Sequence, residues 1–364
     1  MSKKKSVFFA GGGTGGHIYP ALAVAQKLPK DIDVCFFCSK RPVDSSILQK
    51  TDYRYIPLAA RPLSINPVFL LCFVISFFRA CTEMLKTRNC VVVGVGGFVA
   101  APVVVAAKFL GKPLMFINVD IVPGTANRKL ARLASKIFVQ FESTKDKFGS
   151  GKFEIFACGC PLRSDFDSPN AGNILNDLSL DPEKKTLLVT GASSGAHNIN
   201  MAMKHLIDKL SEFKDNWQVV HLSGKGKAGD LQQSYEKGGI KACVLEYCDD
   251  MPQLLTACDL VIGRCGAVSV AEFIATCTPA VCLPYPYHAD QHQRLNAMEM
   301  EKLGTAVIAT DHKDDYCKTS EELWLALNPL LSDAGKINSM TVALRNTDRN
   351  NASKFISDRI IELL

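Results

Sequence analysis

SVFFAGGGTGGH, at residues 6–17, is the stretch that decides the fold. A short apolar run passes directly into a glycine-rich loop, and IYPALAVAQKL at residues 18–28 then has the composition of a helix. A buried strand, a tight glycine turn and a helix in this order are typical of the first unit of a parallel α/β sheet. The fold class that follows is α/β.

The same loop also predicts chemistry. Gly15 and Gly16 place backbone N–H groups at the start of a helix, where the helix dipole favours an anion such as a phosphate or diphosphate. His17 follows at once, so we expect its imidazole beside that anion, at the mouth of a cleft. A lone histidine is often structural, but a histidine in this position is our candidate for the catalytic base.

A dinucleotide site is an alternative interpretation of this loop. Gly11, Gly13 and Gly16 satisfy the GxGxxG spacing between a strand and a helix. The second strand of such a site should end in an acid that holds the ribose, whereas here it runs into Lys40 and Arg41. The match is therefore weak, although the two cations leave a phosphorylated dinucleotide open.

The opening pattern returns in the second half of the chain. TLLVTG at residues 186–191 leads into GASSGAHN, whose glycines and serines can wrap a diphosphate or simply cap a helix. Further strands enter glycine turns at Gly94 and Gly263, and SDFDSPNAGN at residues 164–173 is polar and turn-rich, like a linker.

We therefore expect two facing Rossmann-like domains with mainly parallel sheets, at residues 1–163 and 164–350. Their glycine loops should lie at the carboxyl ends of the strands and line a shared cleft. A last helix, at about residues 351–364, can cross back and pack on the first domain.

Composition limits the partners and the compartment. A net charge of +6 over 364 residues is too small to argue for nucleic acid, but it suits an anionic membrane surface or a phosphorylated substrate. The 14 cysteines lack zinc spacing, and the CxxC of Cys35 and Cys38 lies inside an apolar strand, so we interpret them as buried thiols in a reducing cytoplasm. The most apolar stretch, Pro67 to Phe78, has twelve residues, too few to span a bilayer as a helix, which leaves a buried or an interfacial helix.

No obligatory metal or cofactor is expected. The Asp-x-Asp triplets at Asp31/Asp33 and Asp165/Asp167 have a spacing that can hold a divalent metal, but the first precedes a strand and the second lies in the linker. We interpret all four carboxylates as solvated turn residues.

The segment from Gly263 to Asn296 holds the densest set of polar candidates. Glu272 lies about two turns into a helix among apolar neighbours, where a carboxylate can accept hydrogen bonds from the two hydroxyls of a ribose. The residues placed to hydrogen-bond sugar hydroxyls after the next strand are Asp290, Gln291, His292, Gln293 and Asn296.

These segments also form a recognisable set. GGGTGGHIYPALAVAQ, GVGGFVAAP, VPGTANRKLA, GCPLR, GASSGAHNIN and CGAVSVAEF followed by DQHQRLNA occur in one order over nearly the whole chain. In this combination the chain resembles the MurG family, the peptidoglycan glycosyltransferases that add N-acetylglucosamine to lipid I. The resemblance implies a GT-B fold and an inverting transfer from UDP-N-acetylglucosamine to the muramyl 4-hydroxyl of an undecaprenyl-diphosphate-linked acceptor. It also implies a peripheral enzyme on the cytoplasmic face of the bacterial inner membrane, which makes lipid II for peptidoglycan synthesis.

The resemblance further implies roles for particular residues. Serines of the third glycine loop in sequence, GASSGAHN at residues 191–198, would meet the donor phosphates, and Glu272 would bind the ribose. Arg163 would contact the nucleotide at the hinge, and the backbone near Cys248 would contact the uracil. His17 would lie in or near the position of the catalytic base. The donor set is Thr14, Gly15, Gly16, Arg163, Ser193, Ser194, Gly195, Cys248, Met251, Ala267, Glu272, His292 and Gln293. The acceptor set is Gly13, Gly96, Gly97, Asp120 and Asn127, and the glycine loops at residues 13–16 and 94–97 would face the lipid diphosphate.

The chain departs from the family's pattern in three segments. Asn118, Val119 and Asp120 stand where Glu-Gln-Asn is usual, and Ser194 and His292 each replace a common glutamine. Asp120 has three interpretations: it caps the following VPG turn, it assists the histidine base, or the acceptor differs from lipid I. Three alternatives to the main function stay open: a transferase of this fold with another acceptor, a nucleotide-binding dehydrogenase, and an impaired scaffold that still binds UDP.

Overall fold

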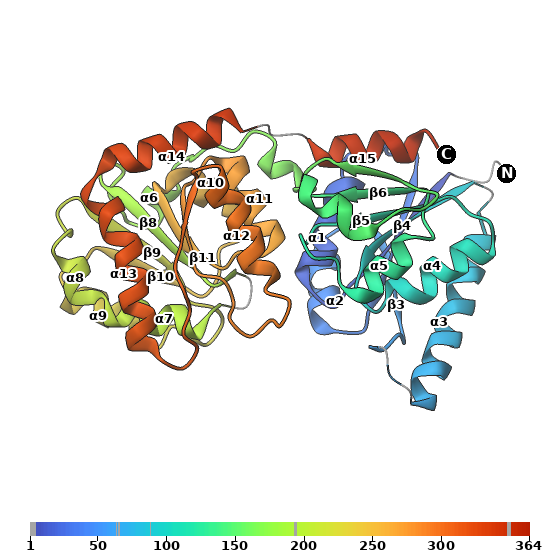
Figure 1. Cartoon of the computed structure of the whole chain (residues 1–364), viewed down its shortest axis with the longest axis horizontal. Coiled ribbons are helices and arrows are strands. Elements are labelled where there is room, and N and C mark those ends of the chain that lie inside the picture. The colour runs from blue at the N-terminus through green and yellow to red at the C-terminus, as the bar shows by residue number, and fades with distance from the viewer. Residues whose placement is uncertain (1–4, 63, 65, 88, 193–194, 348–350) are drawn as a thin grey trace. The chain divides into compact units, whose positions relative to one another are not determined.

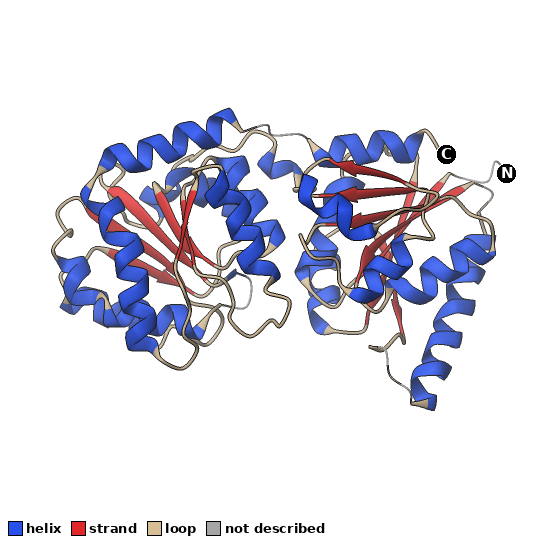
Figure 2. Ribbon diagram, in the orientation of Figure 1, coloured by secondary structure: helices blue, strands red, loops and turns tan. Residues whose placement is uncertain are grey.

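The computed structural model describes residues 5–62, 64, 66–87, 89–192, 195–347 and 351–364. Contacts divide the chain into two compact units, Met1–Ser164 with Asn350–Leu364, and Asp165–Arg349. Within the described residues each unit has one sheet in which all recorded strand pairs are parallel, and helices lie on both sides of each sheet (Figure 2). The expected architecture of two Rossmann-like domains with parallel sheets is confirmed.

The first unit has a seven-stranded sheet in the order β3-β2-β1-β4-β5-β6-β7. Its strands are β1 (Ser6–Gly11), β2 (Asp33–Ser39), β3 (Arg54–Leu58), β4 (Cys90–Gly96), β5 (Leu114–Asn118), β6 (Lys136–Val139) and β7 (Glu154–Ala157). Its helices are α1 (Gly15–Ala25), α2 (Pro42–Leu48), α3 (Pro67–Leu85), α4 (Ala100–Phe109), α5 (Thr125–Ala131), the 3-10 helix η1 (Glu142–Phe148) and α15 (Ala352–Ile361), all labelled or traceable in Figure 1.

The second unit has a six-stranded sheet in the order β10-β9-β8-β11-β12-β13. Its strands are β8 (Lys185–Thr190), β9 (Trp217–Leu222), β10 (Ala242–Leu245), β11 (Leu260–Gly263), β12 (Ala280–Cys282) and β13 (Ala306–Ile308). Its helices are α6 (Ile174–Asp177), α7 (His197–His205), α8 (Ile207–Ser211), α9 (Leu231–Lys237), α10 (Met251–Ala257), α11 (Ala267–Thr276), α12 (His292–Lys302), α13 (Tyr316–Ser332) and α14 (Ala334–Asn346). The 3-10 helix η2 (Ser164–Phe166) lies where one unit gives way to the other.

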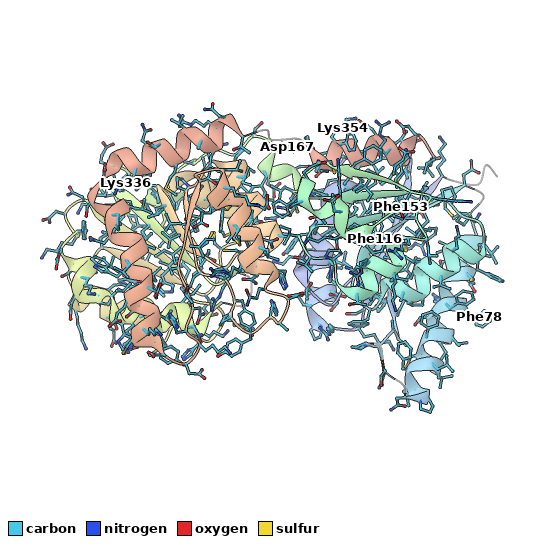
Figure 3. All side chains as sticks on the ribbon, in the orientation of Figure 1. Phe78, Phe116, Phe153, Asp167, Lys336 and Lys354 are labelled. Atoms are coloured by element: carbon cyan, nitrogen blue, oxygen red, sulfur yellow. The ribbon has the colours of Figure 1, made fainter. Side chains whose placement is uncertain are left out.

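Apolar strands form the centre of each unit because both faces of the sheets are covered by helices. Every residue of β1 and β4 is buried, and the Phe116 side chain of β5 lies in the same core (Figure 3). Burial raises the pKa of the Cys35 and Cys38 thiols in β2 to about 12, so these groups stay protonated and pack as apolar side chains.

The last helix returns to the first unit. In α15 the Ser357 hydroxyl donates to the Lys27 carbonyl oxygen over 3.0 Å, and the Ser353 hydroxyl donates to the Leu162 oxygen over 2.8 Å. The Phe355 ring packs edge-on against two phenylalanines of the sheet, with a centroid distance of 5.7 Å to Phe156. The helix therefore belongs to the first unit although it follows the second in sequence.

The apolar helix α3 is longer than the twelve-residue stretch that the sequence marks out. It continues from Phe78 through RACTEML and has 19 residues, because Ala80, Cys81 and Met84 pack in the core of the first unit. Among the described helices α3 is long and apolar enough, by length and composition, to cross a membrane, and 28% of its most apolar window is buried. The argument that this segment is too short to span a bilayer is therefore wrong for the helix as it is built.

Candidate active site

Two glycine loops meet at the carboxyl ends of neighbouring strands in the first unit. The strands β1 and β4 pair in parallel, with Gly11 opposite Gly96, so the loops that follow them start side by side. A Cβ added to Gly97 would lie 2.4 Å from the Gly12 carbonyl oxygen, and Gly97 has a φ of +77°. Only glycine allows this backbone-to-backbone approach.

His17 lies between the two loops and is half-buried. Its Nδ1 is 3.1 Å from the Gly12 carbonyl oxygen and 3.2 Å from the Thr14 hydroxyl. A carbonyl oxygen only accepts, so Nδ1 carries the proton and Nε2 of the neutral ring keeps a free lone pair. A Cβ built on Gly96 would meet both Nε2, at 3.0 Å, and the side-chain nitrogen of Asn127, at 2.7 Å. The predicted base and Asn127 thus lie around Gly96, and the tautomer is the one a general base needs.

Sequence reasoning missed Asp44, a fully buried carboxylate at the third position of α2. Its two oxygens accept from the Gly13 N–H at 2.8 and 2.9 Å, and one of them also accepts from the Ser39 N–H at 2.8 Å and hydroxyl at 2.6 Å. The Gly13 N–H is therefore directed at Asp44. The N–H groups that remain at the start of α1 for an anion are those of Thr14, Gly15 and Gly16. An acid among the first residues of a helix was the available sequence signal.

Arg41 is a cation beside the same loop. Its guanidinium donates to the Gly13 carbonyl oxygen over 3.2 Å and stacks on the Phe98 ring at 5.3 Å from the centroid. Phe98 follows the second glycine loop, at residues 94–97, so Arg41 contacts both the first loop and the residue after the second.

Two further predicted residues lie elsewhere in the first unit. Asp120 is half-buried after β5, and its backbone oxygen accepts from the Asn118 side-chain amide over 2.6 Å. The Arg163 guanidinium lies over the Tyr19 ring of α1, 5.3 Å from the centroid. Neither contact assigns a role to these side chains.

The third glycine loop, in the second unit, follows β8. Ser193 and Ser194, predicted to meet the donor phosphates, lie outside the described residues. Gly195 has a φ of +63°, and a Cβ on it would be 2.3 Å from the Ser223 carbonyl oxygen, so this loop also packs directly on a neighbouring backbone.

A buried neutral network holds that neighbouring backbone in place. The Asn200 amide nitrogen donates to the carbonyl oxygens of Ser223 at 3.0 Å and Lys227 at 3.3 Å, so its oxygen must accept from the His221 Nε2–H at 3.1 Å. His221 Nδ1 then accepts the Tyr235 hydroxyl proton over 2.9 Å. Burial lowers the pKa of His221 to about 3, so the imidazole stays neutral and the direction of every hydrogen bond is fixed.

The ribose and uracil candidates lie on α10 and α11. Glu272 is half-buried in α11, and Ala267 is the first residue of that helix after Gly266. Met251 begins α10, and burial raises the pKa of the Cys248 thiol just before it. Cys248 and Ala267 thus follow closely after β10 and β11, where the carboxyl ends of parallel strands create binding sites, whereas Glu272 lies further along α11, in its second turn.

The sugar-region candidates at the start of α12 are already partly engaged. The Gln293 side-chain oxygen accepts from the Tyr285 N–H at 3.0 Å and the Cys265 N–H at 3.3 Å. His292 Nδ1 is 2.8 Å from an Asp290 carboxylate oxygen. Asn296, by contrast, is fully buried and donates to the Cys265 carbonyl oxygen over 3.0 Å, which is a structural role.

A buried ion pair missed by the sequence ties this region together. The Arg264 guanidinium and the Asp311 carboxylate are 2.8 Å apart, and Arg264 also donates to the Leu283 carbonyl oxygen over 2.8 Å. The Asn198 amide of α7 donates to the same carboxylate over 2.9 Å. The ends of β11, β12 and β13 and the helix after the third glycine loop are therefore held together by one charged pair.

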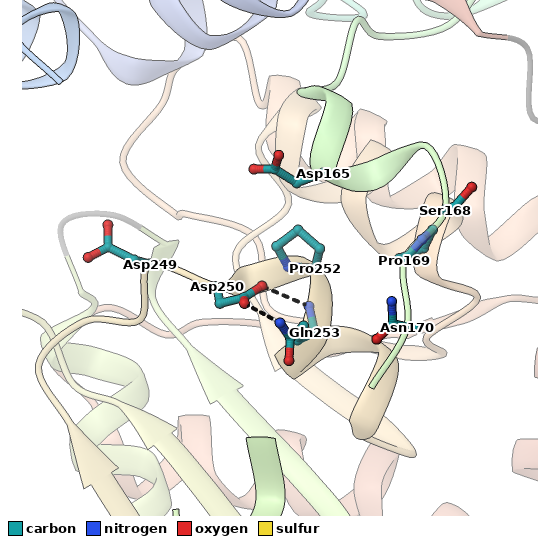
Figure 4. A pocket seen from close by; sticks show the side chains of 8 residues that line it. All are labelled: Asp165, Ser168, Pro169, Asn170, Asp249, Asp250, Pro252 and Gln253. Atoms are coloured by element: carbon teal, nitrogen blue, oxygen red, sulfur yellow. Dashed lines mark hydrogen bonds between the residues drawn. The ribbon is translucent and has the colours of Figure 1, made fainter. Parts of the chain in front are cut away.

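An acidic pocket of about 450 Å³ lies in the second unit and is shown in Figure 4. Asp165, from one Asp-x-Asp triplet, lines it with Asp249 and Asp250, and Asp250 accepts from the Gln253 backbone and side chain at the start of α10. Asp33, of the other triplet, pairs with Arg54 at 3.7 Å. In the part of the chain that the structure describes, no group of three or more His, Cys, Asp or Glu side chains is placed to hold a metal ion.

Two doubly wound units, each with glycine loops at the carboxyl ends of its strands, are the architecture of the GT-B fold. Residues 7–139 match the N-terminal domain of glycosyltransferase family 28, and residues 186–357 match the C-terminal domain of that family. The chain belongs to glycosyltransferase family 28, which confirms the resemblance found in its motifs.

Close relatives match along almost the whole chain. A protein of Chlorobaculum tepidum is 34% identical over 370 residues, which cover 98% of this chain and 99% of that protein. One of Desulfitobacterium hafniense is 32% identical over 360 residues, which cover 95% and 96%. Both are named UDP-N-acetylglucosamine–N-acetylmuramyl-(pentapeptide) pyrophosphoryl-undecaprenol N-acetylglucosamine transferase.

Solved structures share the fold. MurG of Acinetobacter baumannii superposes with a TM-score of 0.77 at 24% identity, covering 99% of both chains. The UDP-GlcNAc 2-epimerase of Neisseria meningitidis, bound to UDP-GlcNAc, gives 0.67 at 14% identity, covering 99% of this chain and 100% of that one. At these identities the likeness concerns the fold alone.

The neutral state of His221 predicts a pH dependence of stability. Its pKa is about 3 when folded and about 6.5 when unfolded, so between these values the unfolded chain binds more protons. Its contribution is fully present above pH 6.5 and is lost as the pH falls toward 3. From pH 7.5 to 5.5 the contribution of His221 to the free energy of unfolding should fall by about 1.4 kcal/mol.

His221→Gln should lower the free energy of unfolding at pH 7.5 but lose that part of the pH dependence, as measured by urea unfolding at both pH values. His205→Gln, an exposed control on α7, should keep the wild-type dependence, and a His221 variant that also keeps it would contradict the assignment.

Proposed function

We propose that this glycosyltransferase moves N-acetylglucosamine from UDP-N-acetylglucosamine to the muramyl 4-hydroxyl of an undecaprenyl-diphosphate-linked acceptor, with inversion at the anomeric carbon. The observation that carries the proposal is that relatives named for this transfer match 95% or more of the chain at 32–34% identity. The product is lipid II, which places the protein in peptidoglycan synthesis.

The chemistry of the step fits the first unit. The acceptor hydroxyl oxygen forms a bond to the anomeric carbon while the bond from that carbon to the UDP oxygen breaks. The hydroxyl proton passes to His17 Nε2, whose lone pair is free because Nδ1 donates to the Gly12 carbonyl oxygen. N–H groups at the start of α1 and in the second glycine loop bind the acceptor diphosphate in this proposal.

The second unit supplies the donor site. UDP leaves as an anion, and we infer that N–H groups of the third glycine loop and the start of α7 meet its charge, without an obligatory metal. Glu272 accepts from the ribose hydroxyls, the backbone at Cys248 and Met251 contacts the uracil, and His292 with Gln293 contacts the sugar. The network of His221 and Asn200 supports these assignments by fixing the backbone against which Gly195 packs.

The direct test is turnover with synthetic lipid I and UDP-N-acetylglucosamine, followed as lipid II formation. We expect kcat of roughly 1 s⁻¹ or faster, as is typical of enzymes, and no loss of it in EDTA. Thermal protection by UDP but not by NADPH would separate this function from a dehydrogenase. UDP binding with no lipid II formed would contradict the assignment of this acceptor and favour another lipid-linked one. The carboxylate of Asp120 is then the first residue to test for recognition of that acceptor.

Two substitutions should separate the two half-sites. Glu272→Ala should weaken UDP binding by about 1–3 kcal/mol, because the ribose hydroxyls lose a charged acceptor. His17→Ala should lower kcat by roughly 10²–10⁴-fold while calorimetry finds UDP affinity nearly unchanged. If Glu272→Ala binds UDP as wild type does, or His17→Ala keeps more than about a tenth of kcat, the residue concerned has another role.

We propose that α3 attaches the protein to the cytoplasmic leaflet of the inner membrane. Leu71, Ile75 and Phe78 are 52–64% exposed on one side of the helix, Phe78 on its outer side in Figure 3, and Phe109 of α4 is 75% exposed nearby, in contact with Phe77. By their spacing Phe69, Leu70, Phe73, Phe77 and Phe78 share roughly one helical face. Of these, Phe69, Phe73 and Phe77 are only partly exposed, whereas Leu70 and Phe78 are exposed. Contiguous apolar surface of this kind marks a membrane or protein contact.

Liposome sedimentation tests the attachment. Each exposed apolar side chain moved into lipid contributes on the order of 1 kcal/mol, so Leu71→Ser, Ile75→Ser and Phe78→Ser together should lower partitioning by roughly a hundredfold. Leu325→Ser, which removes a leucine 72% exposed on α13, is the matched control and should bind like wild type. Equal sedimentation of the triple variant and wild type would exclude α3 as the attachment surface.

A further inference from the structure

The structure places a buried carboxylate and the candidate base on opposite sides of one peptide group. The Gly12–Gly13 peptide donates its N–H to Asp44, at 2.8 and 2.9 Å, and accepts with its C=O from His17 Nδ1, at 3.1 Å. In a planar trans peptide these two groups point in opposite directions, so the carboxylate, the peptide and the imidazole form one continuous chain of hydrogen bonds.

We infer that Asp44 acts on His17 through this peptide and is a positioning residue for the transfer reaction; the inference rests on the proposed role of His17 as the base. A hydrogen bond from the N–H to a carboxylate polarises the peptide and makes its carbonyl oxygen a stronger acceptor. A stronger acceptor holds the His17 proton on Nδ1 and stabilises the imidazolium that forms when Nε2 takes the acceptor proton. The peptide thus does what a carboxylate bonded directly to the histidine does in a serine protease triad.

The loop is built around this arrangement. A Cβ on Gly12 would lie 2.2 Å from an Asp44 oxygen, and Gly13 has a φ of +90°, so neither position accepts another residue without disturbing the chain of bonds. Asp44 is itself fixed, because the Ser39 N–H and hydroxyl donate to it at the end of β2. The carboxylate is fully buried, so its charge acts through the peptide with little screening by water.

Two further polar side chains are recorded beside this chain of hydrogen bonds, those of Arg41 and Thr14. The Arg41 guanidinium donates to the Gly13 carbonyl oxygen, one peptide further along, and the Thr14 hydroxyl lies 3.2 Å from His17 Nδ1. The hydroxyl can accept a share of the same proton but carries no charge. Asp44 is thus the carboxylate that the recorded hydrogen bonds connect to the histidine.

The first test needs no variant and no substrate. Nitrogen-15 NMR of histidine-labelled protein, with the His17 signals identified by their loss in His17→Gln, reports which ring nitrogen carries the proton. Wild type should have it on Nδ1. A proton on Nε2 in wild type overturns the inference.

Asp44→Asn removes the charge while keeping the shape. An amide oxygen at the position bonded to Ser39 still accepts there, so we expect the fold to survive, as checked by the thermal melt. We expect the NMR signals of His17 to move toward the Nε2–H tautomer. We expect kcat to fall roughly tenfold while KM for UDP-N-acetylglucosamine stays unchanged. This loss of kcat is far smaller than the about 10⁴-fold loss caused by removing the charge of a triad carboxylate bonded directly to the histidine. Asp33→Asn makes the same charge change at the other end of β2 and should leave both readouts as in wild type.

A double-mutant cycle separates action through the histidine from a general effect on the loop. If Asp44 works through His17, Asp44→Asn should lower kcat in wild type but have no further effect in the His17→Gln background. Equal losses in both backgrounds, or an unchanged tautomer in Asp44→Asn, would overturn the inference. Lack of lipid I turnover by wild type would instead contradict the proposed function, since the tautomer measurement does not depend on it.

Discussion

The Gly12 backbone passes within contact distance of both the second glycine loop and a buried carboxylate, and the geometry of the first unit's site depends on that crowding. A side chain at Gly12 would occupy the position of an Asp44 oxygen, and one at Gly97 would collide with the Gly12 carbonyl oxygen. The two glycine loops can therefore pack against each other in only one arrangement. The His17 imidazole is oriented by its hydrogen bond to the Gly12 carbonyl oxygen. That oxygen can be reached because the glycines around it carry no side chains.

The second unit also holds a glycine loop against neighbouring backbone, but it supports that backbone with different residues. Its glycine loop also packs on bare backbone, at Ser223 and Gly224, but the support beneath is neutral: Tyr235, His221 and Asn200 donate in sequence, ending at two carbonyl oxygens. A neutral network suits the place where a diphosphate is expected, because a buried carboxylate near that loop would repel the ligand. The first unit instead has a buried carboxylate, Asp44, which lies on the opposite side of the Gly12–Gly13 peptide from His17.

The sequence predicted the parts of the fold whose residues are buried on both faces. SVFFAG, VVVGV and TLLVT are almost wholly apolar, each ends in or is followed directly by a glycine, and each belongs to a central strand. It did not predict β3, β7 and β13, which lie at the edges of the sheets. Such strands carry residues like Arg54 and Glu154 and are only half-covered, so their apolar alternation is weak. The sequence did not predict the buried charges of Asp44 and of the Arg264–Asp311 pair for another reason. A buried charge is recognised by the groups it pairs with, and Gly13 and Asp311 are far in sequence from Asp44 and Arg264, respectively.

The helix α3 shows how burial and exposure divide within one element. Its last two turns carry Ala80 and Met84 into the core and bring the buried carboxylate of Glu83 to Arg54 of β3 at 2.9 Å and to Lys86 at 2.7 Å. Burial alone would raise the pKa of Glu83, but hydrogen bonds from Lys86 and Arg54 outweigh it and lower that pKa, so the carboxylate stays charged and anchors the helix. The earlier turns present leucine, isoleucine and phenylalanine to solvent at Leu70, Leu71, Ile75 and Phe78. Because the anchor already fixes the helix, these side chains are not needed to hold it, and together they form an apolar surface of the kind that marks a membrane or protein contact.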